Sequence, residues 1–342
     1  MTEAERKPQS EPHIWGRILS RNPLVTISAT NQLCPVGLMS VAGDVIGDRP
    51  ALHLLHHTWS LEGQHARMIA DGVQAELATR RQGHFVMMAS NDLEVAALAE
   101  QGVPCIVGSG LLMTDERIWY PREAPQHAAQ YDAVYVSRLD ALKRHELAAA
   151  LDRVMLVYGM SLDPDGGTSF ERTRQLLPRA TFANHDFNAG IYRKFTPDET
   201  ATLLALSKVG LCLSAVEGCM RASMEYLLCG LPVISTRSVG GRDRYFGASY
   251  CRVVPRDDPD LIAAAVKEVA ALGLDRGRIR QHVGQVLAFE RHNFLLAVNG
   301  LARRRFGLDY DLFPVITPFL GVIANHRPAS EVRLSVADQL QG

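Results

Sequence analysis

The strongest constraint on the fold is a regular alternation of short apolar runs with longer helical patterns. The apolar runs predict strands at 24–30, 51–57, 84–90, 103–109, 133–137, 154–158, 180–183, 209–214, 232–236 and 250–254. Helical patterns lie between them, and the sequence from Thr196 to Glu199 (TPDE) predicts a capped helix start with proline at its first position. This alternation indicates an α/β protein built from right-handed βαβ units on parallel sheets.

The length of 342 residues predicts about two domains. Residues 112–130 interrupt the alternation with two prolines and mixed charges, which is typical of a linker. We therefore predict an N-terminal Rossmann-like domain at 13–125 and a second one at 126–305. Residues 1–12 are expected to form a disordered tail, and 306–342 an extension that could pack back on the first domain. Ligands of such sheets bind beyond the carboxyl ends of the strands.

Composition excludes several classes of function. Lys plus Arg (36) nearly equals Asp plus Glu (37), which argues against a nucleic-acid partner held by backbone charge. Six cysteines without a C-x2-C pair argue against a zinc ribbon or a thioredoxin-like site. The chain has no apolar run of 18 residues and no apolar start, so we expect a cytoplasmic protein. Peripheral contact with the inner face of a membrane stays open, and Arg303–Arg305 is its candidate segment.

Two glutamates follow the apolar run that ends at Ser214. Glu217 lies in the turn before a predicted helix, which we expect to begin near Cys219 or Met220. Glu225 lies on that helix, eight residues after Glu217. The first amides of the helix, from Gly218 onward, have no intrahelical partners and lie at a positive dipole end. The turn is therefore a candidate anion site suited to a diphosphate.

Two cations lie about 80 residues upstream, at the end of another predicted strand. Arg138 and Lys143 are five positions apart. A lysine at a helix start is slightly unfavourable to the helix dipole, which favours a ligand role for Lys143. The positions of Arg138 and Lys143 after a strand place them at the ligand edge of a parallel sheet.

These motifs together resemble the donor site of retaining GT-B glycosyltransferases, the group that includes the glycogen-synthase and phosphatidylinositol-mannosyltransferase types. The E-x7-E and R-x4-K spacings carry the resemblance, and STRSVGG resembles the glycine pair of that family with Gly240 and Gly241. LLHHTW resembles the strand end where the family has a histidine, with His57 the better match and His56 the other candidate. The resemblance covers about residues 24 to 300. Two features depart from it: Met220 stands where the family often has glycine, and the N-terminal domain is expected to be shortened.

The resemblance implies a GT-B enzyme that transfers a sugar from a nucleotide-diphosphate sugar with retention of anomeric configuration. It implies catalytic roles for Arg138 and Lys143, which would neutralise the donor diphosphate, for Glu217 at a sugar hydroxyl, and for His57. It also implies donor-binding roles for Gly218, Cys219, Met220, Arg221, Glu225, His185, Gly240 and Gly241. Glu225 would hold the ribose. No metal and no cofactor beyond the nucleotide sugar is implied.

Several alternatives stay open. Asp163 and Asp165 could form the DxD site of a metal-dependent glycosyltransferase, or the chain could be a non-catalytic nucleotide-sugar-binding subunit that needs a partner chain. Strand alternation sends His56 and His57 to opposite faces, which argues against zinc. Arg221 and Arg242 suggest an anionic substrate as a hypothesis. The acceptor could be a glycan, as in polysaccharide biosynthesis, a lipid-linked glycan or a small molecule, and a homodimer is not excluded.

Overall fold

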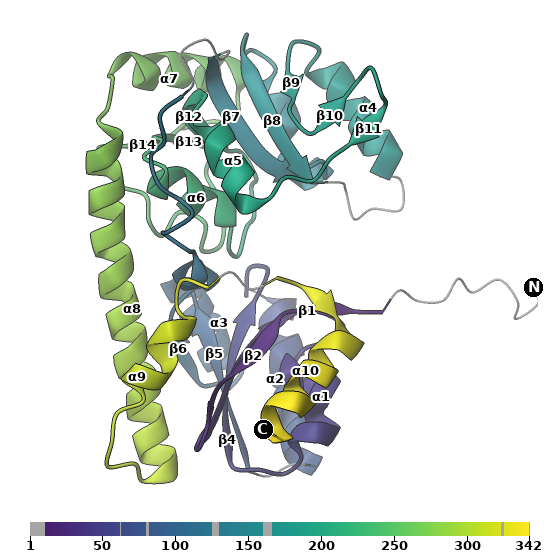
Figure 1. Cartoon of the computed structure of the whole chain (residues 1–342), viewed down its shortest axis with the longest axis vertical. Helices are drawn as coiled ribbons and strands as arrows, with labels where there is room; N and C mark the ends of the chain where they lie inside the picture. Colours follow the sequence, from purple (N-terminus) through teal and green to yellow (C-terminus); the bar gives the residue numbers. More distant parts are fainter. Residues whose placement is uncertain are drawn as a thin grey trace, which may run out of the picture. The chain divides into compact units, whose positions relative to one another are not determined.

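The computed structural model describes residues 11–61, 63–79, 82–124, 130–159, 166–322 and 325–341. The chain divides into two compact units (Figure 1). Unit 1 extends to Met113 and takes in Arg291–Gly342, and unit 2 comprises Thr114–Glu290. The division therefore differs from the boundaries expected at 125 and 305. Residues 114–124 belong to unit 2. Residues 291–305 belong to unit 1, so the division falls within one helix, Arg276–Phe306.

The sheet of unit 1 has the strand order β2-β3-β4-β5-β6, with only β2 antiparallel to its neighbour. The strands are β2 (Gly16–Arg21), β3 (Leu24–Thr30), β4 (Ala51–His57), β5 (Gly83–Ala89) and β6 (Cys105–Val107). The crossover helices are α1 (Leu38–Ile46), α2 (Gln64–Thr79) and α3 (Asp92–Glu100). Every residue of β3 and β4 is buried, as expected for parallel strands covered on both faces. These two strands have the bounds that the apolar runs predicted.

The end of the chain, which shows no regular pattern in the sequence, completes unit 1. Helix α8 (Arg276–Phe306) is followed by α9 (Phe313–Ile316), a 3-10 turn η5 (Thr317–Phe319), β15 (Arg327–Pro328) and α10 (Ala329–Gln341). Strand β15 pairs with β1 (His13–Ile14), and α10 packs against α1 (Figure 1). The Ala329 amide donates to the Pro12 carbonyl over 2.9 Å, so the end of the expected tail is held by α10. The rest of that tail, residues 1–10, lies outside the described residues.

The sheet of unit 2 has the strand order β14-β13-β12-β7-β8-β9, and all its strands are parallel. Its strands are β7 (Tyr131–Arg138), β8 (Val154–Gly159), β9 (Thr181–Phe182), β12 (Ser207–Cys212), β13 (Val233–Ser235) and β14 (Cys251–Val253). From β7 the chain first adds strands on one side and then returns to add β12, β13 and β14 on the other. The strand order therefore reverses between β7 and β12, and this is where an open α/β sheet binds its ligand.

The helices of unit 2 include α4 (Gly166–Leu176), α5 (Pro197–Leu204), α6 (Arg221–Leu228) and α7 (Pro259–Ala271). The capping box predicted for α5 is confirmed, because the Thr196 hydroxyl accepts from the Glu199 amide and the Glu199 carboxylate accepts from the Thr196 amide. A short hairpin of β10 (His185–Asp186) and β11 (Ile191–Tyr192) follows β9. Asp163 and Asp165, the candidate DxD residues, lie outside the described residues. Among the helices described, none is long and apolar enough to cross a membrane.

Candidate functional site

A buried ion pair lies at the switch point of the unit 2 sheet. Lys143 ends the 3-10 turn η3 (Ala141–Lys143) that follows β7, and Glu217 lies in the turn after β12. The Lys143 ammonium donates to the Glu217 carboxylate, and the two residues are 8% and 5% exposed. The R-x4-K and E-x7-E motifs, 74 residues apart, thus meet at one point. Because each charge is buried with an opposite partner, removing either one leaves an uncompensated charge.

The backbone on both sides of this pair is fixed. The Tyr135 hydroxyl donates to the Lys143 carbonyl over 2.7 Å. Burial raises the pKa of Tyr135, so its hydroxyl stays a neutral donor. On the other side, the Glu217 amide donates to the Val239 carbonyl over 2.9 Å. The charged side chains of the pair are therefore carried by backbone segments that Tyr135 and Val239 hold in place.

Gly240 and Gly241, predicted to bind the donor, lie against the turn that carries Glu217. Gly240 has φ +103°, and a Cβ atom there would be 2.0 Å from the Glu217 carbonyl oxygen. The Gly241 amide donates to the Gly218 carbonyl over 3.1 Å. Only glycine allows this approach of two backbones. In the described structure these glycines support the turn, and direct contact with a donor stays a prediction.

We expect Gly240→Ala to destabilise unit 2 by about 2–3 kcal/mol, since it combines a strained φ with a backbone overlap. The melting temperature should fall, and any ligand of the Glu217 turn should bind more weakly. Gly284→Ala is the matched control, because a Cβ atom there meets nothing within 4 Å and α8 gains helix propensity. Equal melting temperatures for Gly240→Ala and the wild type would contradict the packing described above.

Two further arginines border the pair. Arg138 Nε donates to the Asp140 carboxylate over 2.7 Å, and the Arg138 side chain is 39% exposed, so part of its guanidinium remains open to a ligand. Arg144 has the left-handed φ of 53° and donates to the Leu213 carbonyl over 2.6 Å and to the Thr236 hydroxyl over 2.7 Å. Arg144 therefore ties the segments after β7, β12 and β13 together. The position of Arg144 in the sequence gives no sign of this role, because its partners Leu213 and Thr236 lie 69 and 92 positions away. Asp140, two residues after Arg138, was not predicted either.

The hypothesis that Arg242 binds an anionic substrate is wrong. Its side chain is fully buried. The guanidinium donates to the Ser214 carbonyl over 2.6 Å, to the Ser235 hydroxyl over 2.7 Å and to the Asp243 carboxylate over 2.6 Å. Arg242 thus donates to buried polar groups at the carboxyl ends of β12 and β13. Its role is to hold these strand ends, and its charge does not face solvent.

Helix α6 begins at Arg221, slightly later than expected, with Met220 as its N-cap residue. Met220 makes no side-chain cap hydrogen bond, so the helix start keeps amides for an anion. The Met220 side chain is buried and Arg221 is exposed. Glu225 lies half-buried in the second turn, where burial raises its pKa to about 7, against the opposing effect of Arg221. Cys219 is half-buried in the turn before the helix.

His185 lies in the hairpin beyond the end of β9, within a group of aromatic side chains. Its ring stacks on Phe170 with centroids 4.8 Å apart and lies 4.5 Å from the Phe187 ring. The Tyr158 hydroxyl lies 3.4 Å from His185 Nδ1. An aromatic surface of this kind can stack a planar ring. The predicted donor-binding role of His185 stays a prediction.

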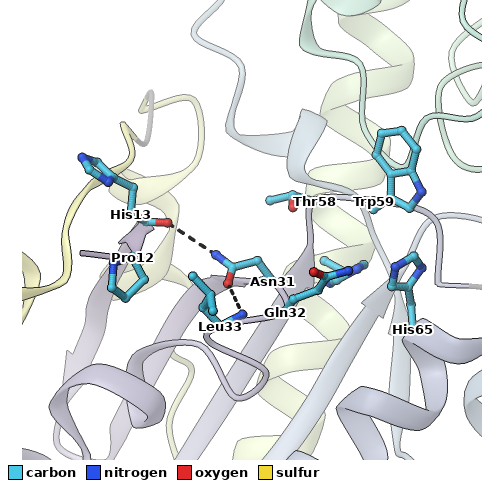
Figure 2. A pocket seen from close by; sticks show the side chains of 9 residues that line it. Pro12, His13, Asn31, Gln32, Leu33, Thr58, Trp59 and His65 are labelled. Atoms are coloured by element: carbon cyan, nitrogen blue, oxygen red, sulfur yellow. Dashed lines mark hydrogen bonds between the residues drawn. The ribbon is translucent and has the colours of Figure 1, made fainter. Parts of the chain in front are cut away.

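His57, the remaining predicted site residue, belongs to unit 1 and ends β4. Its Nδ1 is hydrogen-bonded to the Thr30 hydroxyl over 2.8 Å, whereas its buried Nε2 has no partner. Burial lowers the pKa of His57 to about 4. A pocket of about 410 Å³ opens beside it (Figure 2). The pocket is lined by Pro12, His13, Asn31, Gln32, Leu33, His57, Thr58, Trp59 and His65.

The strand pairing keeps the neighbouring histidines apart, as alternation predicted. His53 lies on the same face as His57 and is hydrogen-bonded to Thr26 over 2.9 Å. His56 lies on the other face near Trp15, and neither of its ring nitrogens has a partner. Within the described residues, no three His, Cys, Asp or Glu side chains are grouped so that they could hold a metal ion.

Comparison with known proteins identifies the fold. No protein-family model and no curated protein matches the chain. Among solved structures it is similar to sucrose-phosphate synthase of Thermosynechococcus elongatus, with a TM-score of 0.53 and 19% identity over 76% of this chain and 68% of that one. It is also similar to the UDP-forming α,α-trehalose-phosphate synthase of Burkholderia xenovorans in complex with glucose-6-phosphate (TM-score 0.54, 12% identity, 79% and 70% covered). Anabaena HepE in complex with UDP and glucose has a TM-score of 0.50 and 18% identity, with 75% and 76% covered.

These structures are GT-B glycosyltransferases, and the chain shares their fold. The predicted fold class is confirmed: two α/β units with parallel sheets, the N-terminal one shortened.

Proposed function

We propose that this chain is a glycosyltransferase that moves a sugar from a nucleoside-diphosphate sugar to an acceptor hydroxyl. The observation that carries the proposal is the Lys143–Glu217 pair, buried at the switch point of the unit 2 sheet. A lysine in this position, beside the partly exposed Arg138 and the uncapped start of α6, forms a site for a diphosphate. The similarity to GT-B structures that form or bind UDP supports the same assignment and makes UDP the first nucleotide to test.

In this proposal the cations act on the leaving group. Arg138 and Lys143 stabilise the negative charge that grows on the diphosphate as the bond from its oxygen to sugar C1 breaks, and the amides at the start of α6 add fixed dipoles. The acceptor oxygen forms its bond to C1 on the same face, which retains the configuration. Its proton passes to the leaving phosphate oxygen. Fixed cations take the place of a metal ion, so the reaction is expected to proceed in EDTA.

The remaining residues position the donor. Glu217 holds Lys143 and can accept from a sugar hydroxyl. Glu225, with a pKa of about 7, can accept from or donate to the ribose hydroxyls. His185 and its aromatic neighbours offer a stacking surface for the base. His57 of unit 1 is proposed to orient the sugar or the acceptor.

One observation favours a second candidate, a nucleotide-sugar-binding subunit that needs a partner chain for turnover. The described strands of unit 1 run in sequence order without a reversal, so this sheet has no switch point of its own. The subunit hypothesis predicts nucleotide binding without sugar transfer by the isolated chain. The metal-dependent alternative through Asp163 and Asp165 predicts that EDTA abolishes transfer.

A thermal-shift panel of UDP, GDP, ADP, dTDP and CMP tests the donor site. A nucleotide at 100 times its dissociation constant should stabilise the wild type by about 2.7 kcal/mol. Arg138→Ala should remove most of that shift. Arg153→Ala is the matched control. Arg153 is also paired with an aspartate, but it directly precedes β8 and so lies at the amino edge of the sheet, away from the proposed donor site. If no nucleotide shifts the wild type, or if Arg138→Ala retains the full shift, the proposed donor site is wrong.

A further inference from the structure

The pocket beside His57 is a site formed by unit 1. Its lining comes from the segments that follow β3 and β4, from the start of α2 and from the strand β1 region (Figure 2). It therefore lies just beyond the carboxyl ends of the parallel strands β3 and β4. Its volume of about 410 Å³ is within the range of small-molecule sites.

The lining of this pocket lacks fixed charge. None of its nine residues is lysine, arginine, aspartate or glutamate. His57 is neutral at pH 7, because burial lowers its pKa to about 4. His13 and His65 are the other titratable residues of the lining. A phosphate or carboxylate that entered this pocket would lose hydration without gaining a permanently charged partner, which is unfavourable.

The lining does offer groups for hydroxyls and for an apolar ring face. The lining includes groups that donate to and accept from hydroxyls, namely the side-chain amides of Asn31 and Gln32 and the hydroxyl of Thr58. His57 Nδ1 is occupied by Thr30, and its Nε2 is buried without a partner, so a hydroxyl reaches Nε2 only when the ring or a neighbouring side chain moves. A ligand hydroxyl that reached Nε2 after such a movement would satisfy a buried polar atom, which favours binding. Trp59 and His65 lie on the same side of the pocket (Figure 2), and both are half-buried. Aromatic faces of this kind pack against the C–H groups of a sugar ring.

We infer that this pocket binds the acceptor of the proposed transfer reaction, and that the acceptor presents a neutral, hydroxyl-rich ring without phosphate or carboxylate. The inference rests on the proposed function, since it assigns the pocket to an acceptor. It narrows the substrate class from any hydroxyl compound to uncharged sugar units. The acceptor class thus differs from glucose-6-phosphate, the ligand named for the trehalose-phosphate synthase structure.

Tryptophan fluorescence of the full chain tests the pocket directly. The chain has three tryptophans. Trp15 and Trp119 are buried and give a constant background, so a ligand beside Trp59 changes the fluorescence of that residue alone. The probes are methyl glucoside, methyl galactoside and methyl mannoside, together with glucose-6-phosphate, UDP and UDP-glucose. At least one methyl glycoside should give a saturable change, with a dissociation constant at least about tenfold below that of glucose-6-phosphate.

Variants locate the signal. Trp59→Phe should abolish the change. His57→Ala should raise the dissociation constant about tenfold, the cost of one lost hydrogen bond to a buried group, and His57→Gln should recover part of that loss. Leu93→Ala, on the exposed surface of α3, is the control and should leave the affinity unchanged.

Three results would overturn the inference. They are equal or tighter binding of glucose-6-phosphate, a signal with UDP-glucose alone, and no saturable signal with any methyl glycoside up to about 100 mM. The second result would assign the pocket to the donor sugar. A normal UDP-dependent thermal shift with any of these results leaves the proposed function intact. A saturable fluorescence change with a methyl glycoside, combined with no thermal shift by any nucleotide, would instead contradict the proposed donor site of unit 2.

Discussion

Replacing Lys143 by methionine is expected to lower kcat for sugar transfer about 100- to 1000-fold, because one fixed charge at the leaving diphosphate is lost. That factor corresponds to about 3–4 kcal/mol of transition-state stabilisation. KM for the donor should change much less, since the charge on the diphosphate grows mainly in the transition state. The measurement is nucleotide release in a steady-state assay with EDTA present, once the nucleotide is identified by thermal shift.

Lys143 is buried with Glu217, so Lys143→Met also leaves a carboxylate without its partner. The double variant Lys143→Met/Glu217→Gln separates the two effects: it should recover stability but not kcat. Lys143→Arg should recover part of kcat. Lys208→Met is the matched control, because Lys208 is paired with Asp132 on the exposed surface near the start of β12. A kcat within about threefold of the wild type for Lys143→Met would exclude the proposed role.

Unit 1 is expected to lose stability steeply as the pH falls below about 6.5, through its buried histidines. Burial lowers the pKa of His53 and His57 to about 4 and that of His56 to about 3, from an ordinary value of 6.5. Between these values and 6.5 the unfolded chain binds more protons than the folded one, so the contribution of each histidine is complete above pH 6.5 and is lost as the pH falls.

Across this window each histidine lowers the free energy of unfolding by about 1.4 kcal/mol for each unit by which the pH falls, so the three together lower it by about 4 kcal/mol per unit. Because a domain has about 5–15 kcal/mol of stability, we expect unit 1 to unfold between about pH 5 and 4. Urea unfolding from pH 8 to 4.5, followed by circular dichroism, measures the slope. Carboxylates titrate in the lower part of the same range and also change the slope. The contribution of a histidine is therefore measured as the difference in slope between the wild type and a variant without that histidine.

His56→Gln should reduce the slope between pH 6.5 and 5 by about 1.4 kcal/mol per unit. The structure favours His56 for this test, since neither of its ring nitrogens has a partner that the substitution would remove. His13→Gln, on the exposed start of β1, is the control. An unchanged slope in His56→Gln would mean that this histidine gains protons as readily in the folded chain as in the unfolded one.

The sequence determined the local structure of this protein. Apolar runs predicted β3 and β4 with their bounds, since strands buried on both faces contain almost only side chains that avoid water. The start of α5 was also predictable, because a capping box involves only residues three positions apart. Two spaced motifs indicated Arg138, Lys143, Glu217 and Glu225 before any geometry was known.

Only the tertiary structure decided which of these residues meet. Lys143 and Glu217 pair because β7 and β12 are neighbours at the point where the strand order reverses, and no local rule fixes that neighbourhood. The anion-binding role predicted for Arg242 is wrong because it too depends on a long-range contact. The side chain donates to groups at the ends of β12 and β13, and the sequence does not show that these strand ends lie beside it. Likewise, the return of 291–342 to unit 1 depends on the pairing of β15 with β1 and of α10 with α1. Such contacts join residues hundreds of positions apart. They form only when the intervening chain brings the two segments together, which costs loop-closure entropy and leaves no local pattern in the sequence.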